Sequence, residues 1–397
     1  MKIIVFGATG FVGRQLVPLL KSRGHHLLIV GRDKDKIKRA FPGIEAATYA
    51  NFADQASLYD LAINLATVNS NSNKSLQEFY AVNRDLLQDL ARRCHDIQIP
   101  KFINFSSVHA LDEQNNGNYA VSKREGANLL KAMCLDNYFS VYLPSVFGKK
   151  WSGKLEFLNK LPKPLARAVF ALLAALKPTV QIDTVVDEIL DENGEAFAPK
   201  IISSRQENNG FYHFVRRAVD LMFAALVIIV FWWLLIALWI AVKIDSRGPG
   251  IFAQRRVGQF GNEFTCYKFR TMTVGTAQRG THEVSKSAVT RVGRVFRKFK
   301  LDELPQVINI LKGEMSLIGP RPCLPVQEEL IHERRIRGVL EIKPGISGYA
   351  QIRNIDMSEP VFLAKTDAAY VGLRGLVLDC KIAIATAFGS GMSDKTR

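Results

Sequence analysis

Cysteine is scarce in this chain, and its few residues are too widely scattered to form a metal-binding cluster. Five occur in 397 residues, at positions 94, 134, 266, 323 and 380. An odd number of scattered cysteines fits a reducing compartment. We therefore expect all five to be buried as small hydrophobic side chains.

The N-terminus lacks the features of a secretory signal peptide. Its first residues, MKIIVFGATG, contain one lysine and then a glycine-rich turn. A signal peptide has instead a long apolar stretch and a cleavage site with small residues. We therefore expect these residues to fold, and to do so in the cytosol.

Acidic residues are too few to balance the basic ones. The chain has 37 Asp and Glu against 53 Lys and Arg, which gives a net charge of +16 at pH 7. Such an excess favours an anionic partner: nucleic acid, a phosphorylated small molecule or acidic lipid headgroups. No groove-reading or base-stacking motif accompanies the charge, and we therefore expect no nucleic acid partner.

Charged residues are absent from Leu221 to Val242, where the sequence reads LMFAALVIIVFWWLLIALWIAV. A helix of this length measures about 33 Å at 1.5 Å per residue, which is enough to cross a bilayer. Arg216, Arg217 and Lys243 flank the segment. A buried helix of a soluble protein seldom stays uncharged for so long, so we expect a membrane segment. Pro, Gly and Ser, the usual causes of a helix kink, are absent from it as well.

The composition divides the chain into three parts. Residues 1–208 alternate short apolar runs with helical patterns, which predicts a doubly wound, Rossmann-type parallel sheet. Residues 209–243 comprise the end of a polar linker, SRQENNG at 204–210, and the membrane segment. Residues 244–397 are basic, with scattered Gly and Pro, and predict a small mixed α/β domain at the membrane. The predicted fold class is α/β.

A glycine-rich turn follows the first apolar run. In IIVFGATGFVG, Gly7, Gly10 and Gly13 come directly after the predicted strand and open a helix. Glycine lets backbone N–H groups approach a pyrophosphate, and the helix N-terminus adds partial positive charge. The second predicted strand ends in LLIVGRDKDK, where Arg32 precedes any acid. An arginine there favours NADP(H) and its 2′-phosphate, with NAD and a merely solvated charge cluster as alternatives.

A tyrosine and a lysine lie four residues apart in NYAVSKREGA, and so share one helix face. The ammonium of Lys123 stabilises tyrosinate, and we expect it to lower the pKa of Tyr119. Ser107 ends the preceding run FINFSS, where it could orient a substrate oxygen. Behind a glycine-rich turn, this set resembles the extended, sugar-nucleotide-modifying branch of the short-chain dehydrogenase/reductase superfamily, as does LPSVFG at Leu143–Gly148. The resemblance implies that Ser107, Tyr119 and Lys123 are the catalytic residues.

Two adjacent acids end the basic run RVGRVFRKFK in the last part of the chain. Asp302 and Glu303 stand directly before Leu304-Pro305. Acids there can begin a helix, where they meet its positive end, form a salt-bridged surface, or act as a catalytic pair on an anionic substrate. In the third case a carboxylate attacks phosphorus and forms an acyl phosphate, while Mg²⁺ and basic side chains neutralise the diphosphate.

Three long motifs of this part are identified as those of the bacterial sugar transferases, the monotopic phosphoglycosyl transferases. They are GPGIFAQRRVGQFGNEFTCYKFRTM (Gly248–Met272), LDELPQVINILKGEMSLIGPRP (Leu301–Pro322) and KPGISGYAQIRN (Lys343–Asn354), within a resemblance over residues 211–397. The resemblance implies that Asp302 is the nucleophile and contacts Mg²⁺, and that Glu303 completes the acid pair. It makes Arg321 a candidate for binding the nucleotide, and Lys268 and Arg270 candidates for binding the substrate phosphates or the lipid phosphate.

The two predicted sites flank one apolar segment, although both need cytosolic substrates. We therefore expect the segment to enter and leave by the same face of the bacterial inner membrane, as a re-entrant or kinked helix. Both domains would then lie on the cytoplasmic face, and positive charge on both flanks agrees with this. A shallow anchor and a true crossing are the alternatives.

Together these features predict a bifunctional membrane enzyme of bacterial glycan biosynthesis. The C-terminal domain would transfer a phospho-sugar from a UDP-sugar to undecaprenyl phosphate and release UMP. The N-terminal domain would prepare the sugar with NADPH, by reducing a 4-keto group to give a UDP-6-deoxy-HexNAc. Alternatively, that domain is an epimerase or dehydratase that recycles bound NAD, or an inactive nucleotide-binding module. Membrane lipid is a further expected partner, and a homodimer is left open.

Overall fold

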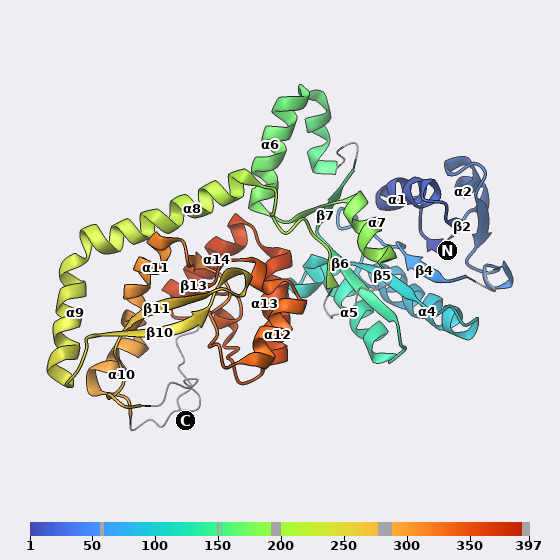
Figure 1. Cartoon of the computed structure of the whole chain (residues 1–397). Coiled ribbons are helices and arrows are strands. Elements are labelled where there is room, and N and C mark those ends of the chain that lie inside the picture. The colour runs from blue at the N-terminus through green and yellow to red at the C-terminus, as the bar shows by residue number, and fades with distance from the viewer. Residues whose placement is uncertain (56–58, 149–150, 152, 192–199, 277–287, 391–397) are drawn as a thin grey trace. The chain divides into compact units, whose positions relative to one another are not determined.

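The computed structural model describes residues 1–55, 59–148, 151, 153–191, 200–276 and 288–390 (Figure 1). The chain divides into two compact units. The first comprises Met1–Phe170 and Pro178–Arg205, and the second comprises Ala171–Lys177 and Gln206–Arg397. Each unit is described by itself below.

The first unit is built on a seven-stranded sheet with the strand order β3-β2-β1-β4-β5-β6-β9. Every neighbouring pair in it is parallel. The strands are β1 (Lys2–Phe6), β2 (His26–Gly31), β3 (Glu45–Thr48), β4 (Leu61–Asn64), β5 (Phe102–Ser107), β6 (Tyr138–Leu143) and β9 (Lys200–Ile201). The order reverses direction between β1 and β4, as in doubly wound nucleotide-binding sheets. The predicted Rossmann-type parallel sheet is therefore confirmed.

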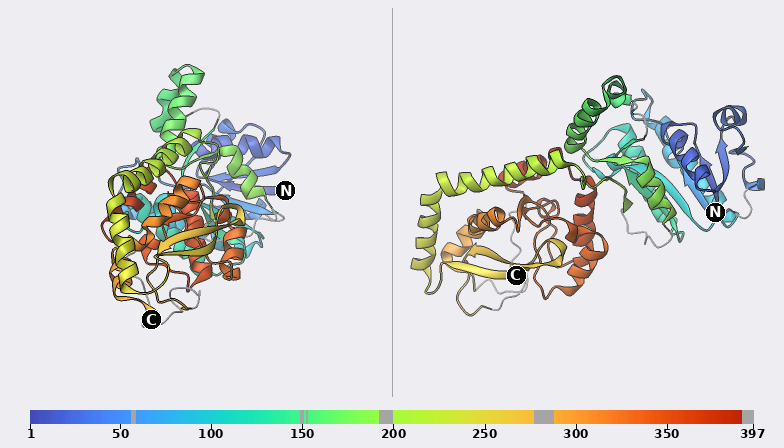
Figure 2. Two further views of the ribbon diagram at one scale, coloured as in Figure 1. Left: turned by 60° about the vertical axis from the view of Figure 1, so that its left-hand side comes forward. Right: turned by 45° about the horizontal axis from the view of Figure 1, so that its top comes forward.

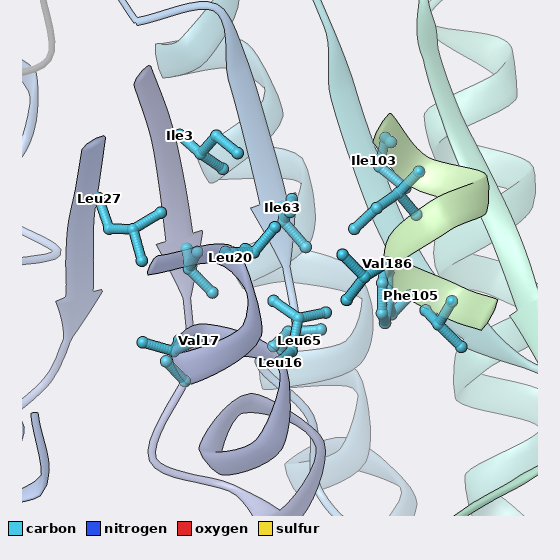
Figure 3. Close-up of a cluster of buried hydrophobic side chains, with 14 of the residues drawn as sticks. Ile3, Leu16, Val17, Leu20, Leu27, Ile63, Leu65, Ile103, Phe105 and Val186 are labelled. Atoms are coloured by element: carbon cyan, nitrogen blue, oxygen red, sulfur yellow. The ribbon is translucent and has the colours of Figure 1, made fainter. Parts of the chain in front are cut away.

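Helices cover both faces of this sheet, and the side chains of β1 alternate between them. Ile3 and Val5 belong to one buried cluster with residues of α1 (Phe11–Ser22) and α7 (Ile182–Leu190); Figure 3 labels Ile3, Leu16 and Val186 among its members. Ile4 and Phe6 face the other way, towards α4 (Leu87–Asp96) and α5 (Asn118–Ala132). This period of two explains why the strand reads as a continuous apolar run, because both of its faces are covered.

The remaining elements of the first unit are short or peripheral. They are α2 (Lys34–Ala40), α3 (Leu76–Tyr80), the π-helical turn η2 (Ala81–Leu86), the 3-10 turns η1 (Ala53–Gln55), η3 (Val108–Leu111) and η4 (Gly153–Lys160), and the parallel pair β7 (Ser145–Phe147) and β8 (Thr179–Gln181). The helix α6 (Lys163–Leu176) is shared between the two units.

The second unit begins with a bent helix. The helix α8 (Gly210–Ala225) continues into the π-helical turn η5 (Leu226–Val230), and α9 (Trp232–Asp245) follows after Phe231. The two arms meet at 70°, and the bend is visible in Figure 1 and in both views of Figure 2. Phe231 leaves the helical conformation, with φ −106° and ψ 20°. A π-helical turn and one non-helical residue thus make the bend in a segment that has no Pro, Gly or Ser.

No single helix among the described residues reaches the length and apolarity needed to cross a bilayer. The bent pair Gly210–Val230 and Trp232–Asp245 meets those criteria together, judged on length and composition alone.

The rest of the second unit surrounds an antiparallel hairpin. The hairpin pairs β10 (Ile251–Val257) with β11 (Glu263–Phe269), and the parallel pair β12 (Ser316–Ile318) and β13 (Gly345–Ser347) lies elsewhere in the unit. The helices are α10 (Arg291–Lys298), α11 (Val307–Lys312), α12 (Glu328–Ile336), α13 (Pro360–Leu373) and α14 (Leu376–Ala387), and the 3-10 turns are η6 (Gln259–Gly261), η9 (Leu301–Gln306), η10 (Val339–Glu341) and η11 (Gln351–Arg353).

One expectation from the sequence is wrong in detail. Cys94, Cys266 and Cys323 are buried as expected, but Cys134 and Cys380 are exposed. Cys134 lies in a left-handed turn after α5, with φ 50°, and Cys380 lies on the outer face of α14. Within the predicted polar linker, Gln206 is buried, and its Nε2 donates to Ala174 O at 2.6 Å and to Arg374 O at 3.3 Å.

Candidate active sites

Asp302 and Glu303 are held inside the second unit by a tight turn between two helices. Lys300 ends the approach from α10 in a left-handed conformation, with φ 55°, and η9 starts at the next residue. Both acids lie in the first turn of η9 and both are buried, at 9% and 5% exposure. Both acids do lie at the start of a helix. Acids that only begin a helix or form a surface salt bridge would be exposed to solvent, whereas these two are buried.

The next helix is attached to the hairpin by one buried amide. Asn309 of α11 donates from Nδ2 to Thr265 O at 2.7 Å and accepts at Oδ1 from Tyr267 N at 3.2 Å. The apolar side chains of β11 and α11 pack in the same core cluster. This attachment brings Lys268, the next residue of β11, close to the acids of η9.

Two of the three predicted cations contact the acid pair. Lys268 Nζ lies 3.1 Å from Glu303 Oε1, and Arg321 Nη2 lies 2.8 Å from the same oxygen. These residues come from β11 and from the turn after β12, so the contact joins three segments that are distant in sequence. Charge-assisted contacts of this length, at a buried carboxylate, are strong and directional.

The two acids have opposite protonation tendencies. Burial, and then the negative charge of Glu303, raise the pKa of Asp302 to about 6. Burial alone would also raise the pKa of Glu303, but Arg321 and Lys268 hold that pKa below its usual value. Environments that shift the pKa values of two neighbouring carboxyl groups in opposite directions are typical of sites with acid–base or nucleophilic roles.

The pair also offers oxygen atoms that suit Mg²⁺. Glu303 Oε2 is buried and has no hydrogen-bond partner, while Oε1 carries both cations. No group of three or more His, Cys, Asp or Glu side chains in the described part of the chain could hold a metal by itself. Mg²⁺ usually takes one or two carboxylates and completes its shell with water and substrate phosphates, so the residues present fit it.

Arg270, the third predicted cation, contacts a different segment. Its Nη2 donates to Ser246 O at 2.6 Å and to Ser246 Oγ at 2.9 Å, directly after α9. Its Nε and Nη1 are buried without hydrogen-bond partners. The structure therefore brings Lys268 and Arg321 to the acid pair, and directs Arg270 to the end of the bent helix.

Sequence reasoning missed three further arginines of this region. Arg256 is half-buried and donates from Nη1 to Pro322 O at 3.0 Å; desolvation, and then the charge of Arg321, lower its pKa to about 10. Arg297, within the basic run, is one of the charges that lower the pKa of Asp302. Arg334 donates to Arg321 O at 2.8 Å. The stretches QRRVG, RVGRVFRKFK and HERRIR look like exposed basic surfaces, so only their motif context could have singled them out.

In the glycine-rich turn of the first unit, close backbone packing requires glycine at two positions. Gly7 has φ 72°, and a Cβ there would lie 2.5 Å from Ala66 N. A Cβ on Gly13 would lie 2.2 Å from Ala8 O. A Cβ on Gly10 would meet only Gly7 O, at 3.7 Å. Gly10 also begins α1 without a side-chain cap, which leaves room for an anion at that helix N-terminus.

Ser107, Tyr119 and Lys123 lie together at the end of β5. Ser107 Oγ is hydrogen-bonded to the hydroxyl of Tyr119, and Lys123 Nζ donates to Phe105 O at 2.9 Å. Burial lowers the pKa of Lys123 to about 8. Burial also raises the pKa of Tyr119, and its hydrogen bond with Ser107 opposes this only in part. The expected lowering of the tyrosine pKa by lysine is therefore wrong for this structure, because Lys123 bonds to the strand instead.

Arg32 follows β2 directly and is exposed. The acid after it, Asp33, accepts hydrogen bonds from Asp35 N and Lys36 N, both at 3.0 Å, and so caps α2. At the end of this strand the carboxylate is occupied by the backbone, whereas the guanidinium faces solvent.

The fold and the two sites define an α/β unit with a glycine-rich turn after its first strand, joined to a unit with a buried acid pair among cations. Residues 211–391 match the family described as bacterial sugar transferase, and residues 3–170 match the NAD dependent epimerase/dehydratase family. The chain belongs to the bacterial sugar transferases and carries an epimerase/dehydratase-type domain at its N-terminus.

Three relatives illustrate the similarity of each part of the chain. The Aeromonas hydrophila UDP-N-acetylgalactosamine-undecaprenyl-phosphate N-acetylgalactosaminephosphotransferase is 37% identical over 44% of this chain, which spans only 43% of that protein. The uncharacterized sugar transferase EpsL of Bacillus subtilis is 40% identical over 43% of this chain and 85% of its own length. The NAD complex of Bacillus cereus UDP-glucuronic acid 4-epimerase is 18% identical, with a TM-score of 0.40, over 51% of this chain and 77% of that one.

Proposed function

We propose that this chain transfers a phospho-sugar from a UDP-sugar to undecaprenyl phosphate and modifies the sugar beforehand in its N-terminal domain. The observation that carries the proposal is the buried pair Asp302-Glu303, with Lys268 and Arg321 on one oxygen of Glu303. Both cations pair with Glu303, which leaves the carboxylate of Asp302 in a cation-rich site where it could attack a diphosphate. The A. hydrophila relative, which acts on a UDP-sugar and undecaprenyl phosphate by its name, supports the substrate class.

The proposed reaction has two displacements at one phosphorus atom. A carboxylate oxygen of Asp302 attacks the sugar-bearing phosphorus, a new O–P bond forms, and the bridging P–O bond breaks with its electron pair leaving on UMP. An oxygen of undecaprenyl phosphate then attacks the same phosphorus and breaks the acyl phosphate bond. Asp302 is regenerated as a carboxylate, and the product is an undecaprenyl diphosphate sugar. Splitting one transfer in this way replaces a difficult step by two easier ones.

The basic side chains make that approach of two anions feasible. Glu303 keeps Lys268 and Arg321 close together, and both cations lower the cost of bringing the diphosphate beside Asp302. Asp302 and the free Oε2 of Glu303 would hold Mg²⁺. When bound there, the ion would supply additional neutralisation of phosphate charge. Arg270 and Arg297 are candidates for the phosphate of the lipid.

For the N-terminal domain we propose an NADPH-dependent reductase that acts on a 4-keto sugar nucleotide, as a step towards a UDP-6-deoxy-HexNAc. Gly7, Gly10 and Gly13 would receive the pyrophosphate, and the exposed Arg32 would pair with the 2′-phosphate. Tyr119 would donate the proton to the carbonyl oxygen, and Ser107 would orient that oxygen. The raised pKa of Tyr119 keeps the hydroxyl protonated at neutral pH, as a proton donor requires.

The family match of residues 3–170 supports a second candidate for this domain, an epimerase or dehydratase that recycles bound NAD. The two candidates differ in stoichiometry. A reductase releases one NADP⁺ for each sugar, whereas an epimerase or dehydratase leaves the total of oxidised cofactor unchanged.

We also propose that residues 209–243 form a re-entrant anchor in the bacterial inner membrane, with residues 1–208 and 244–397 as the two catalytic domains on its cytoplasmic face. The 70° bend in an uncharged segment supports this arrangement. In a background where the exposed Cys134 and Cys380 are replaced by serine, cysteines introduced near each flank, at Arg205 and Arg247, should both react with a membrane-impermeant maleimide only from the cytoplasmic side. Labelling of one from each side would indicate a crossing helix instead.

One incubation tests the catalytic proposal. Purified full-length protein is given a panel of UDP-sugars, Mg²⁺, undecaprenyl phosphate and NADPH, and UMP release and NADPH absorbance are followed together. We expect UMP release with at least one sugar, and a covalent adduct on Asp302 by mass spectrometry when the lipid phosphate is omitted. Normal turnover by Asp302→Asn would reject the mechanism.

A further inference from the structure

The helix α8 carries a polar face that is bound inside the second unit. Arg216, one of the predicted flanking charges of the apolar segment, is not directed to solvent or lipid headgroups. Its Nη2 donates to Ile318 O, and its Nε donates to Ser316 Oγ at 3.1 Å. Both acceptors belong to β12, the strand that leads to Arg321.

The guanidinium of Arg216 is itself oriented by a buried polar cluster. Its Nη1 donates to the hydroxyls of Tyr212 at 3.0 Å and Tyr370 at 3.2 Å. Both hydroxyls donate to Asp379, at 2.9 and 2.7 Å, and Asp379 lies 3.9 Å from Nη1. With all three nitrogens engaged, the arginine can take up only one position against β12.

The strand β12 leaves little freedom to the residues that follow it. On its other side, Gly319 N donates to Ser347 O at 2.8 Å, and Pro320 O accepts from Gly345 N at 2.9 Å. Asp220, one helical turn after Arg216, accepts from Leu317 N at 2.7 Å. The chain is thus held between β13 and α8 as far as Pro320, and the next residue is Arg321.

The same helix face also reaches the segment of the acid pair. Arg217 donates to Ile310 O at 2.7 Å and to Leu311 O at 3.1 Å, at the end of α11. That helix directly follows η9, which carries Asp302 and Glu303. One turn of α8 therefore contacts β12 and α11, the elements that lie next in sequence to Arg321 and to the acid pair.

We infer that Arg216 is a positioning residue of the transferase site: through Ile318 and Ser316 it sets the place of Arg321 against Glu303. Since α8 continues into the bent apolar segment, the membrane anchor and the active site form one scaffold. A test of this inference by enzyme activity rests on the proposed transferase function, whereas a test by hydrogen–deuterium exchange does not.

The first test is hydrogen–deuterium exchange of the full-length protein in lipid nanodiscs. Arg216→Met should raise the exchange rate of the amides from Leu317 to Cys323 about tenfold or more. Lys243→Met is the matched control, because it also removes a flanking charge, but its Nζ donates to Gly248 O at 3.1 Å and lies over the ring of Trp239 instead of bonding to β12. It should leave the exchange of these amides unchanged. Unchanged exchange in Arg216→Met would overturn the inference, whether or not any UDP-sugar is turned over.

The second test is a double-mutant cycle on UMP release with a UDP-sugar that the wild type accepts. We expect Arg216→Met to lower kcat/KM about 10- to 100-fold, because small displacements of a positioned group cost this much. In an Arg321→Met background the same change should cost less than about threefold, since its target is gone. Additive losses would indicate a general structural role and overturn the inference. Arg216→Lys, which keeps the charge but loses the guanidinium geometry, should fall between wild type and Arg216→Met, and provides the same comparison if Arg216→Met does not fold. If no sugar is turned over even by wild type, the proposed function fails while the exchange result still decides the inference.

Discussion

The guanidinium of Arg334 donates a hydrogen bond to the carbonyl oxygen of Arg321, with an Nη1–O distance of 2.8 Å. Arg334 is fully buried in α12, and Asp367 of α13 accepts from its Nε at 3.0 Å and its Nη2 at 2.7 Å. The buried Arg334–Asp367 pair therefore holds the backbone carbonyl of Arg321, while the guanidinium of Arg321 contacts Glu303. We therefore expect the proposed transferase site to depend on the Arg334–Asp367 ion pair, although neither residue is a predicted substrate contact.

Removing Arg334 should affect stability and activity separately. Arg334→Met leaves Asp367 buried and unpaired, which should cost about 3–5 kcal/mol in the free energy of unfolding. Adding Asp367→Leu should restore most of this stability, because the unpaired charge is gone, but not UMP release, because Arg321 O still lacks its donor. Chemical denaturation and the rate of UMP release measure the two effects. Arg335→Met, on the exposed side of the same helix, is the control and should change neither. Recovery of activity in the double variant would contradict the positioning of Arg321 by this pair.

Transferase activity should have an acidic limit near the pKa of Asp302. The nucleophile must be a carboxylate, so protonation stops the reaction, and the raised pKa places half-protonation at about pH 6 instead of near 3.8. The rate of UMP release should therefore decline as the pH falls through about 6. Single-turnover measurements without undecaprenyl phosphate isolate this first step. A flat profile down to pH 5 would show that Asp302 ionises normally.

The neighbours of Asp302 should move that limit in opposite directions. Glu303→Gln removes the negative charge that helps to raise the pKa of Asp302, so the limit should shift to lower pH. Lys268→Met removes a cation that lowers this pKa, so the limit should shift to higher pH. Both variants should also be slower, because each removes part of the charge arrangement around the diphosphate. Shifts of the same sign in both variants would be incompatible with the assignment.

The sequence predicted the sheet of the first unit well because its signals are local. KIIVF and LAINLA are apolar on both faces, and a glycine-rich turn between strand and helix has few structural solutions. The bend of the apolar segment was less accessible, since it arises from a π-helical turn and not from Pro or Gly. Arg216 and Arg217 looked like flanking charges because their acceptors, such as Ile318 O, lie about a hundred residues later in the chain. Arg334 was invisible for the same reason: its partner Asp367 is 33 residues away, and HERRIR by itself reads as a solvated helix face.

Tyr119 should be needed for the first activity and not for the second. Tyr119→Phe removes the proposed proton donor, and NADPH oxidation with a 4-keto substrate should fall about 100-fold or more. UMP release from a UDP-sugar that needs no reduction should be unchanged. Tyr138→Phe is a suitable control. The hydroxyl of Tyr138 donates to Ile99 O at 2.8 Å. Tyr138 is the first residue of β6, whereas Leu143, which pairs with Ser107, is the last. That variant should lose about 1 kcal/mol of stability but keep reductase activity. Normal NADPH oxidation by Tyr119→Phe would show that Tyr119 is not the proton donor, whereas a wild type that oxidises no NADPH would support the inactive-module alternative.

Alanine substitutions at two positions of the glycine-rich turn should distinguish an effect on folding from an effect on cofactor binding. At Gly13 the new Cβ would lie 2.2 Å from Ala8 O and 2.5 Å from Ala8 Cα, so the backbone must shift and the first unit should melt at a lower temperature. At Gly10 the Cβ meets only Gly7 O, at 3.7 Å, and φ is −74°, so Gly10→Ala should melt like wild type. The added methyl group nevertheless occupies the space beside the N-terminus of α1, where a pyrophosphate would lie. We therefore expect Gly10→Ala to weaken NADPH binding about tenfold or more, measured by fluorescence titration. Gly210→Ala, with open space around its Cβ, should leave the affinity unchanged. Wild-type affinity in Gly10→Ala would mean that the dinucleotide does not approach this turn, and would remove the reason for assigning a cofactor to it.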